Sequence, residues 1–370
     1  MKTVLIAPRK YVQGRGVFRE AGTYIGMLGK KPLVLWDSCV KEIVGEVVLA
    51  SLKEAGLEVV EVQFEGESTR EEASRVAQIA KDNGADVAVG IGGGKALDTA
   101  KGAAVEAGIK LVTAPTIASN DSPTSGASVW YDDQGNFIRW DCWPFNPDIV
   151  LVDSQVIAGA PVRAFVAGMG DALSTWLEAE AAYKTRSANL AGGVSTQVAM
   201  AVAQLCYETL MEYGVEAKRA VEKKVLTPAV EKVIEANVLM SGLGFESGGL
   251  ATAHMIANAL PALPECHNFM HGEKVGFGVI SQLCLDEDMD VDEVYAIVDF
   301  EISVGLPVTF ADLNVEEVTR ERLKPIADVC AGEGSLCVNH PFEVSCDSVI
   351  DAMIAADALG QFRKEMLGVA

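Results

Sequence analysis

The sequence predicts an N-terminal α/β domain with a parallel, doubly wound sheet, followed by an all-α C-terminal domain. Short apolar runs alternate with helix-periodic segments through residues 1–160, the order typical of parallel strands joined by helices. From Pro161 onward alanine, leucine and glutamate dominate, and strand-like runs are few. A chain of 370 residues is also too long for one ordinary core. We therefore expect two domains, at residues 1–160 and 161–370.

The expected strands are short runs rich in valine, leucine and isoleucine. They lie at residues 32–36, 57–64, 86–91, 110–114 and 148–152, with a shorter β-like piece at 10–14. Helices are predicted between these strands, and right-handed crossovers would carry them over the sheet. Residues 127–131 and 136–140 flank a polar turn at 132–135 and predict a β-hairpin. In the second half, helices are expected at about 161–183, 188–212, 227–241, 271–285, 291–303 and 347–366.

Composition narrows the class of protein. Hydrophobic residues make up 49% of the chain, which indicates a folded core. The net charge is −22 and the pI about 4.6, so nucleic acid and anionic membrane surfaces are not expected partners. No apolar run is long enough for a membrane helix, and the first residues do not resemble a signal peptide. The 8 cysteines are scattered without a CxxC pair, so we expect reduced thiols in a cytoplasmic protein.

A glycine-rich stretch, Gly90–Lys95, is the most informative segment. An apolar run precedes it and apolar residues at helical spacing follow it, which predicts a strand, a tight turn and a helix. The free N–H groups that begin such a helix, with Lys95 beside them, favour a phosphate group. The stretch is neither a Walker A loop nor the dinucleotide fingerprint, whose third glycine is Lys95 here. Alternatively, the turn binds no phosphate and only allows the strand and the helix to pack closely.

Two further segments follow strands in this half of the chain. Asp37 lies at the carboxyl end of the run 32–36, where ligands bind in such sheets. Its carboxylate would accept both ribose hydroxyls of NAD and repel the 2′-phosphate of NADP, or it would cap the following helix. The polar loop that follows the run 110–114 carries hydroxyls at Thr116, Ser119 and Ser125, which can line a phosphate or nicotinamide pocket.

A candidate metal site comes from three helix-like segments that contain Asp171, His254 and His271. An aspartate within an apolar helical stretch needs a partner, and a cation is one. One carboxylate and two imidazoles can bind a divalent metal while leaving a position open, as a catalytic zinc site requires. The alternative is that these histidines hydrogen-bond within the core. His267 and His271 are spaced i, i+4. This spacing is compatible with two metal ligands on one helix and also with an exposed pair of histidines.

Five segments together resemble the iron-containing alcohol dehydrogenase family, and in particular its zinc-dependent, glycerol-oxidising branch. They are Gly90–Lys95 with Asp98, Pro115–Ser119, Gly170–Leu173, Gly244–Leu250 and His271–Val275. The resemblance runs through nearly the whole chain. It implies a dehydroquinate synthase-like fold, in which an α/β domain binds NAD and a helical domain binds metal, with the active site in the cleft between them.

The resemblance also implies roles for individual residues. It implies that Asp171, His254 and His271 are metal ligands. It also implies that His254 and the carboxylate of Asp121 bind the substrate. All four residues would be catalytic. The implied NAD contacts are Asp37, Gly94, Lys95, Asp98, Thr116, Ser119, Ser125, Ala127 and Tyr131. The resemblance further implies one zinc ion per subunit, a small polyol substrate and a homo-octamer.

Four positions, Thr175, Asn258, Gly126 and Ala127, depart from the family pattern. Iron-binding members place a histidine four residues after the aspartate, where this chain has Thr175, and three protein ligands fit zinc better than iron. A second family histidine is Asn258 here, which removes a candidate proton relay and leaves the general base open. His267 matches no ligand position. Gly126 and Ala127 stand where the branch usually has bulkier residues near the nicotinamide.

The expected reaction is NAD-dependent oxidation of glycerol to dihydroxyacetone, or of a related small vicinal diol. Another alcohol dehydrogenase of the same family and a non-catalytic NAD- or metal-binding protein are alternatives. A same-fold lyase resembling dehydroquinate synthase is a third. Such a lyase must hold a phosphate and a carboxylate, which calls for several basic side chains. The metal-site segments offer mainly Lys274, so an uncharged polyol fits better.

Overall fold

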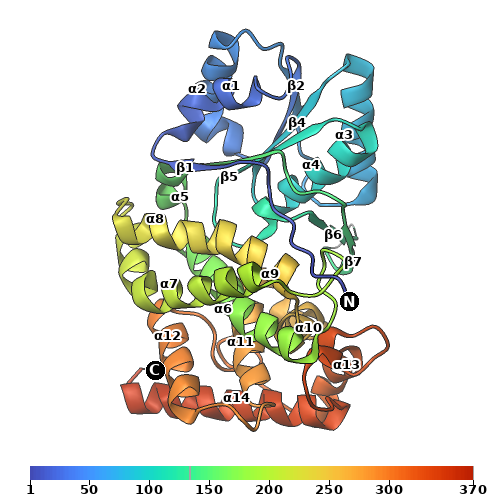
Figure 1. The fold of residues 1–370 in the computed structure, drawn as a ribbon. Helices are drawn as coiled ribbons and strands as arrows, with labels where there is room; N and C mark the ends of the chain where they lie inside the picture. Colours follow the sequence, from blue (N-terminus) through green and yellow to red (C-terminus); the bar gives the residue numbers. More distant parts are fainter. Residues whose placement is uncertain (133–134, 370) are drawn as a thin grey trace. The chain divides into compact units, whose positions relative to one another are not determined.

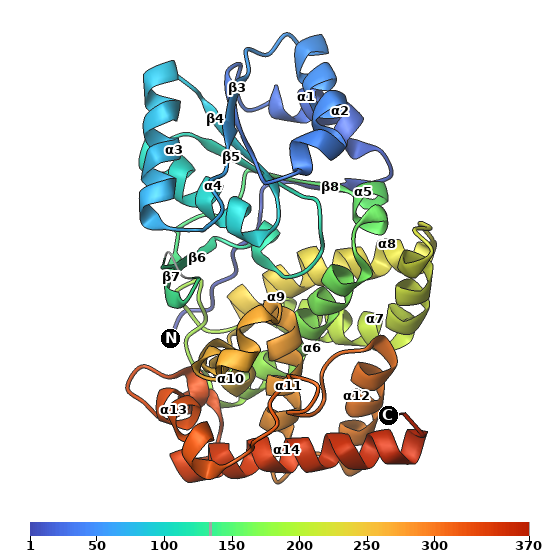
Figure 2. The same ribbon diagram turned by 180° about the vertical axis from the view of Figure 1, so that it is seen from behind.

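The computed structural model describes residues 1–132 and 135–369, which form two compact units (Figures 1 and 2). The sheet unit comprises Ile6–Phe165 and Ala220–Gly242, and the helical unit comprises Met1–Leu5, Val166–Arg219 and the chain from Leu243 onward. The expected division at residue 160 stays a prediction, as does the cleft. Part of the expected hairpin turn, Asp133 and Gln134, lies outside the described residues.

Six parallel strands form the sheet, in the order β1-β8-β5-β4-β2-β3. Their bounds are β1 Tyr11–Gly14, β2 Pro32–Trp36, β3 Val60–Gln63, β4 Val87–Gly92, β5 Lys110–Pro115 and β8 Ile149–Asp153. The strand order reverses next to β4, because β2 and β3 lie on one side of it and β5 and β8 on the other. The predicted doubly wound α/β sheet is therefore confirmed.

Helices cover both faces of this sheet (Figures 1 and 2). They are α1 Ala21–Ile25 and α2 Val40–Glu54 on one face, and α3 Arg70–Asn83 and α4 Gly94–Ala107 on the other. Alternate residues of β2 serve the two faces: Val34 and Trp36 pack with α1 and α2, whereas Leu33 and Leu35 pack with α3 and α4. The strand is apolar on both faces because both faces are buried.

The sheet unit contains several smaller elements. The predicted hairpin is present as antiparallel β6 Ala127–Tyr131 and β7 Phe137–Cys142. The others are η1 Val17–Glu20, η2 Ser122–Thr124, α5 Ser154–Gly159, α8 Pro228–Glu235 and the π-helical turn η3 Ala236–Met240. One continuous helix was expected over 227–241, but the π-helical turn interrupts it. Asn237 in this turn donates to the carbonyls of Ala118 and Phe165, which ties the turn to the rest of the unit.

The second half of the chain is helical, as predicted. Its helices are α6 Val162–Thr185, α7 Gln197–Glu222, α9 Ser241–Gly248, α10 Thr252–Ala259, α11 His271–Leu283, α12 Val291–Val304, α13 Arg320–Cys330 and α14 Cys346–Leu367, with short turns η4 Leu260–Ala262, η5 Pro264–Asn268 and η6 Leu336–Asn339. Helix α7 begins later than the expected residue 188. Gly192 has a φ of 87°, which is left-handed, so a continuous helix cannot run through that residue. Within the described residues, no helix is long and apolar enough to span a membrane.

Candidate metal and cofactor sites

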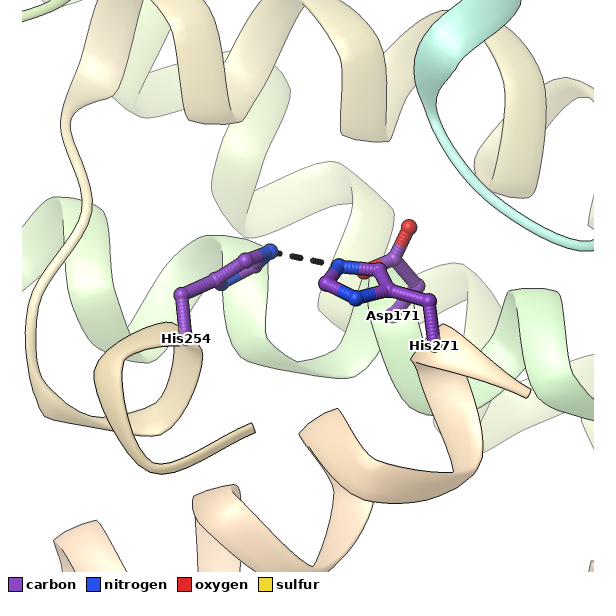
Figure 3. Close-up of side chains that lie close together, drawn as sticks. All are labelled: Asp171, His254 and His271. Atoms are coloured by element: carbon purple, nitrogen blue, oxygen red, sulfur yellow. Dashed lines mark ion pairs between the residues drawn. The ribbon is translucent and has the colours of Figure 1, made fainter. Parts of the chain in front are cut away.

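Three side chains from three helices of the helical unit converge on one point. Asp171 comes from α6, His254 from α10 and His271 from α11, and their ligand atoms all lie within 4.8 Å of one another. Asp171 Oδ1 is 3.5 Å from His254 Nε2 and 3.4 Å from His271 Nε2. Figure 3 shows the two rings and the carboxylate turned toward one another. The structure thus brings together the three predicted ligands.

Glycines allow the three helices to approach this closely. A Cβ on Gly272 would lie 1.8 Å from the carbonyl oxygen of Ala167, and a Cβ on Gly170 would lie 2.3 Å from the carbonyl oxygen of Gly272. These contacts press α11 against α6, directly beside His271 and Asp171. Further along α11, a Cβ on Gly278 would lie 2.3 Å from the carbonyl oxygen of Ala253, next to His254. Backbone contacts at three glycines therefore set the spacing of the ligands.

A fourth residue, Glu178, fixes the orientation of His254. Its carboxylate lies 2.5 Å from His254 Nδ1 and also accepts the backbone N–H groups of Ala251 and His254, at 2.9 and 3.0 Å. With Nδ1 engaged, Nε2 is the nitrogen that faces Asp171. Sequence analysis missed Glu178. Its position on the same helix as Asp171, two turns later in an alanine-rich segment, was the available signal.

The protonation of the two histidines reflects the surrounding carboxylates. Burial alone disfavours a charged His254, but the charge of Glu178 and hydrogen bonds to Asp171 and Glu178 raise its pKa well above the usual value. Burial lowers the pKa of His271 to about 4, so this ring is neutral near pH 7. The carboxylates thus favour a positive charge at the point where the ligand atoms converge, and a divalent cation would supply that charge.

The donor set fits a divalent transition metal. Two imidazole nitrogens and one carboxylate suit zinc with an open coordination position, and they also suit ferrous iron. Thr175, where a fourth ligand was considered, packs instead against α9: a Cβ on Gly244 would lie 2.3 Å from Thr175 Cγ2. His267 is exposed, and its Nε2 lies 2.6 Å from the Pro261 carbonyl oxygen, outside the ligand cluster.

In the sheet unit, the predicted glycine turn joins β4 to α4 at the carboxyl edge of the sheet. No side chain caps the N-terminus of α4, whose N-cap is Gly93. Asp37, at the end of β2, lies beside the turn and accepts the Gly93 N–H at 2.9 Å and the Ser38 N–H at 2.7 Å. A Cβ on Gly92 would lie 2.2 Å from the Asp37 Cβ. Asp37 therefore supports the turn and lies at the edge where dinucleotides bind.

Lys95 belongs to a small cluster at this turn. Its Nζ lies 2.6 Å from Glu67 Oε2 and 4.7 Å from the ring centroid of Tyr131. The first turn of α4 also meets the polar loop, because a Cβ on Gly94 would lie 2.5 Å from Asn120 Nδ2. The structure thus brings together Lys95 and Tyr131, two of the predicted cofactor contacts, and adds Glu67, which the sequence did not indicate.

Asp98 and the polar loop form a buried network around Lys101. Lys101 is 1% exposed, and its Nζ donates to Asp98 Oδ1, to the Ser122 carbonyl and to the Ala127 carbonyl, at 2.9, 2.7 and 2.6 Å. The Ser125 hydroxyl lies 3.4 Å from the same Nζ. The predicted residues Asp98, Ser125 and Ala127 are therefore joined by a lysine that the sequence did not single out.

The remaining predicted residues lie in the same unit. Thr116 follows β5, is buried, and donates its backbone N–H to the Gly92 carbonyl at 3.1 Å. Ser119 is half-buried and Asp121 is buried, and both lie in the loop between β5 and β6. The predicted cofactor residues and Asp121 thus belong to the sheet unit, and the metal ligands belong to the helical unit.

The chain is similar to known proteins over nearly its full length. The iron-containing alcohol dehydrogenase family matches residues 8–154. A glycerol dehydrogenase of Escherichia coli O6:H1 is 44% identical over 361 residues, covering 98% of each chain. A glycolaldehyde reductase of Halobacterium salinarum is 43% identical and covers 98% of this chain and 99% of its own. The crystal structure of glycerol dehydrogenase from Schizosaccharomyces pombe superposes with a TM-score of 0.96 at 35% identity, covering 100% of this chain and 94% of that one. The chain therefore belongs to the iron-containing alcohol dehydrogenase family.

Proposed function

We propose that this chain oxidises glycerol to dihydroxyacetone, with NAD⁺ taking up the hydride and a proton being released. The observation that carries the proposal is the convergence of buried Asp171 and His254 with half-buried His271. The relative of Escherichia coli, named glycerol dehydrogenase and similar over nearly the full length, supports the choice of substrate.

The metal that we propose at Asp171, His254 and His271 is zinc, because Thr175 leaves three protein ligands. The ion supplies Lewis acidity, which lowers the pKa of a substrate hydroxyl. The chain's own residues hold the geometry: Glu178 keeps Nε2 of His254 directed at the site through its 2.5 Å contact with Nδ1. We assign Asp121 the role of hydrogen-bonding a substrate hydroxyl.

For the cofactor, we propose NAD with its pyrophosphate at the N-terminus of α4. The absence of a side-chain cap there leaves the first N–H groups available to an anion, and the Lys95 ammonium, paired with Glu67, lies on the same turn. The carboxylate of Asp37 lies beside this turn and favours NAD over NADP by repelling a 2′-phosphate. NAD supplies the hydride acceptor, and the protein orients it.

A second candidate is the reduction of glycolaldehyde, since the relative of Halobacterium salinarum carries that name at 43% identity. It is the reverse hydride transfer to a small hydroxyaldehyde and needs the same ligands. The same-fold lyase receives no support from the names of these relatives. The homo-octamer stays a prediction.

NADH formation from glycerol and NAD⁺ tests the proposal. Activity should be lost after chelation and restored by zinc more fully than by iron. We expect His271→Asn to abolish turnover and metal retention, whereas His267→Asn, an exposed histidine four residues earlier, should leave both unchanged. Ethylene glycol oxidation and glycolaldehyde reduction in the same assay separate the two candidates. Full activity of His271→Asn, or of the chelated protein, would contradict the metal assignment.

A further inference from the structure

One buried amide, that of Asn237, connects the π-helical turn η3 to the loop between β5 and β6. The side chain is fully buried, and its Nδ2 donates to the carbonyl of Ala118 at 3.1 Å and to the carbonyl of Phe165 at 3.0 Å. All three residues belong to the sheet unit. Among the described residues, Asn237 Oδ1 has no hydrogen-bond partner. The two N–H groups of the amide are therefore what ties the turn to the loop.

The turn η3 holds the same loop at a second point. The hydroxyl of Thr124, in η2, donates to the carbonyl of Val238, and η2 packs against η3. Hydrogen bonds in a π-helical turn close five residues apart, so the α-helical pattern is interrupted where the loop attaches. Just beyond the turn, a Cβ on Gly242 would lie 2.3 Å from Thr124 Oγ1 and 3.0 Å from the carbonyl oxygen of Asp121. Glycine at this position thus allows the loop to approach closely.

These contacts lie beside the residues that we propose bind the cofactor and the substrate. Thr116 and Ser119, two proposed NAD contacts, flank the bonded carbonyl of Ala118. Asp121, the proposed substrate contact, follows in the same loop. The bonds of Lys101 join the later part of the loop, after Asp121. The η3 amide therefore fastens the earlier part, which contains these proposed NAD contacts.

The second bond of the amide leads to a rigid element. Phe165 lies in the first turn of α6 and is 1% exposed, so its carbonyl is a fixed point for the Asn237 side chain. One amide thus ties the loop to a buried helix. A loop with such an anchor is ordered before a ligand binds, and binding then costs less conformational entropy.

We propose that Asn237 is a positioning residue for the cofactor, because it holds the loop between β5 and β6 in the conformation that binds NAD. This inference rests on the proposed function. The fully buried amide acts through the carbonyl of Ala118 and not by contact with the cofactor. Without its two bonds the loop samples other conformations, and ordering it offsets part of the binding free energy. The affinity for NAD therefore falls, whereas the affinity for zinc, whose proposed ligands belong to the helical unit, stays the same.

The experiment compares Asn237→Ala with Asn189→Ala in the full-length protein. Asn189 is a matched control in the helical unit: it is 6% exposed, and its Nδ2 also donates to two carbonyls, those of Val4 and Ser247, at 2.9 and 2.8 Å. Isothermal titration calorimetry should show that Asn237→Ala raises the dissociation constant of NAD⁺ about tenfold. Asn189→Ala should leave that constant unchanged, although urea unfolding shows a comparable loss of stability in both variants.

Hydrogen–deuterium exchange of the cofactor-free variants tests the loop directly. Peptides from residues 116–126 should exchange about tenfold faster in Asn237→Ala and at the parental rate in Asn189→Ala. Thr124→Val removes the second bond to η3 with little change of shape. It should raise both the NAD⁺ dissociation constant and the exchange rate, and it supplies the test if Asn237→Ala fails to fold.

Contrary results are defined for each readout. An NAD⁺ affinity that is unchanged in folded Asn237→Ala, or that falls equally in Asn189→Ala, would overturn the positioning role. Exchange of the loop at the parental rate would overturn the ordering that we infer. Failure of the unaltered protein to bind NAD⁺ would refute the proposed cofactor and with it the positioning role. Faster exchange in Asn237→Ala would even then show that the amide orders the loop.

Discussion

The backbone contact at Gly272 offers the sharpest test of how the proposed metal site is built. Replacing Gly272 with alanine adds one methyl group to α11, and this group would lie 1.8 Å from the carbonyl oxygen of Ala167 on α6. Both contact partners are parts of helical backbone, so neither can rotate away. The neighbouring residues in sequence and space are His271 and Asp171. The substitution changes neither the charge nor the donor atoms of the site.

The required movement follows from ordinary contact distances. Because van der Waals contact begins at 3.4 Å, the two helices must part by about 1.6 Å at this point. Metal–ligand distances tolerate only about 0.2 Å. Overpacking of this kind costs about 1–3 kcal/mol of folding free energy. We therefore expect Gly272→Ala to remain folded near room temperature but to lose at least about tenfold in zinc affinity and in turnover.

Zinc affinity by competition with a chelator and glycerol oxidation at saturating zinc measure the effect. Gly276→Ala is the matched control, because it adds the same methyl group on the same helix. Its Cβ would lie 3.6 Å from Glu301 Oε2, an ordinary contact. This control should match the unaltered protein or gain up to about 1 kcal/mol from helix propensity. Equal zinc affinity in both variants would refute the argument that glycine contacts set the ligand spacing.

Three further predictions concern buried ionisable side chains. Glu178→Gln presents either an amide or a carbonyl to His254 Nδ1, so the ring loses its fixed tautomer; zinc affinity should fall about 10–100-fold, measured by competition. Lys101→Met leaves the Asp98 carboxylate buried without its cation and should cost about 3–5 kcal/mol in urea unfolding. Burial raises the pKa of the Glu301 carboxyl, which favours its neutral form in the folded protein. The contribution of Glu301 to the free energy of unfolding should therefore fall as pH rises from about 4.3 through the higher folded-state pKa. Glu301→Gln should flatten that part of the stability–pH curve.

Each of these three has a defined contrary result. Unchanged zinc affinity in Glu178→Gln would show that the carboxylate does not fix the ring. A Lys101→Met protein as stable as the parent would show that the Lys101–Asp98 pair does not stabilise the buried network. Parallel stability–pH curves for Glu301→Gln and the parent would place the Glu301 carboxyl in a more polar environment than its burial indicates.

The sheet was predictable from sequence because its strands are buried on both faces. Such strands are continuous apolar runs, and the helices between them keep a clear periodicity. The glycine turn at Gly92 was equally visible, since glycines that permit close backbone approach leave a direct mark in the sequence. No bounds were predicted for α10, although His254 was expected on a helix-like segment, and α13 was not predicted. Helix α10 spans only Thr252–Ala259, and α13 contains Pro325 and few apolar residues, so neither has a long periodic pattern.

The convergence of Asp171, His254 and His271 followed from chemistry and resemblance, but the residues that support it did not. Glu178 acts across the space between α6 and α10, and no spacing along the chain expresses that contact. Lys101 resembles an ordinary surface lysine in sequence, and only the packing of the polar loop over α4 buries it. Supporting residues are recognised by tertiary contacts, which the sequence does not show. Metal-donor atoms occur in only a few residue types, so candidate ligands can be found in the sequence.

The bonds around Lys101 have a consequence for how strongly the proposed cofactor would bind. A loop that must order itself around a ligand loses conformational entropy at that moment, and the apparent affinity falls accordingly. Here one ammonium group bonds the carbonyls of Ser122 and Ala127, so contacts within the protein itself fix the segment between β5 and β6. The ordering of this segment is then part of folding, and the proposed cofactor would lose no affinity to it.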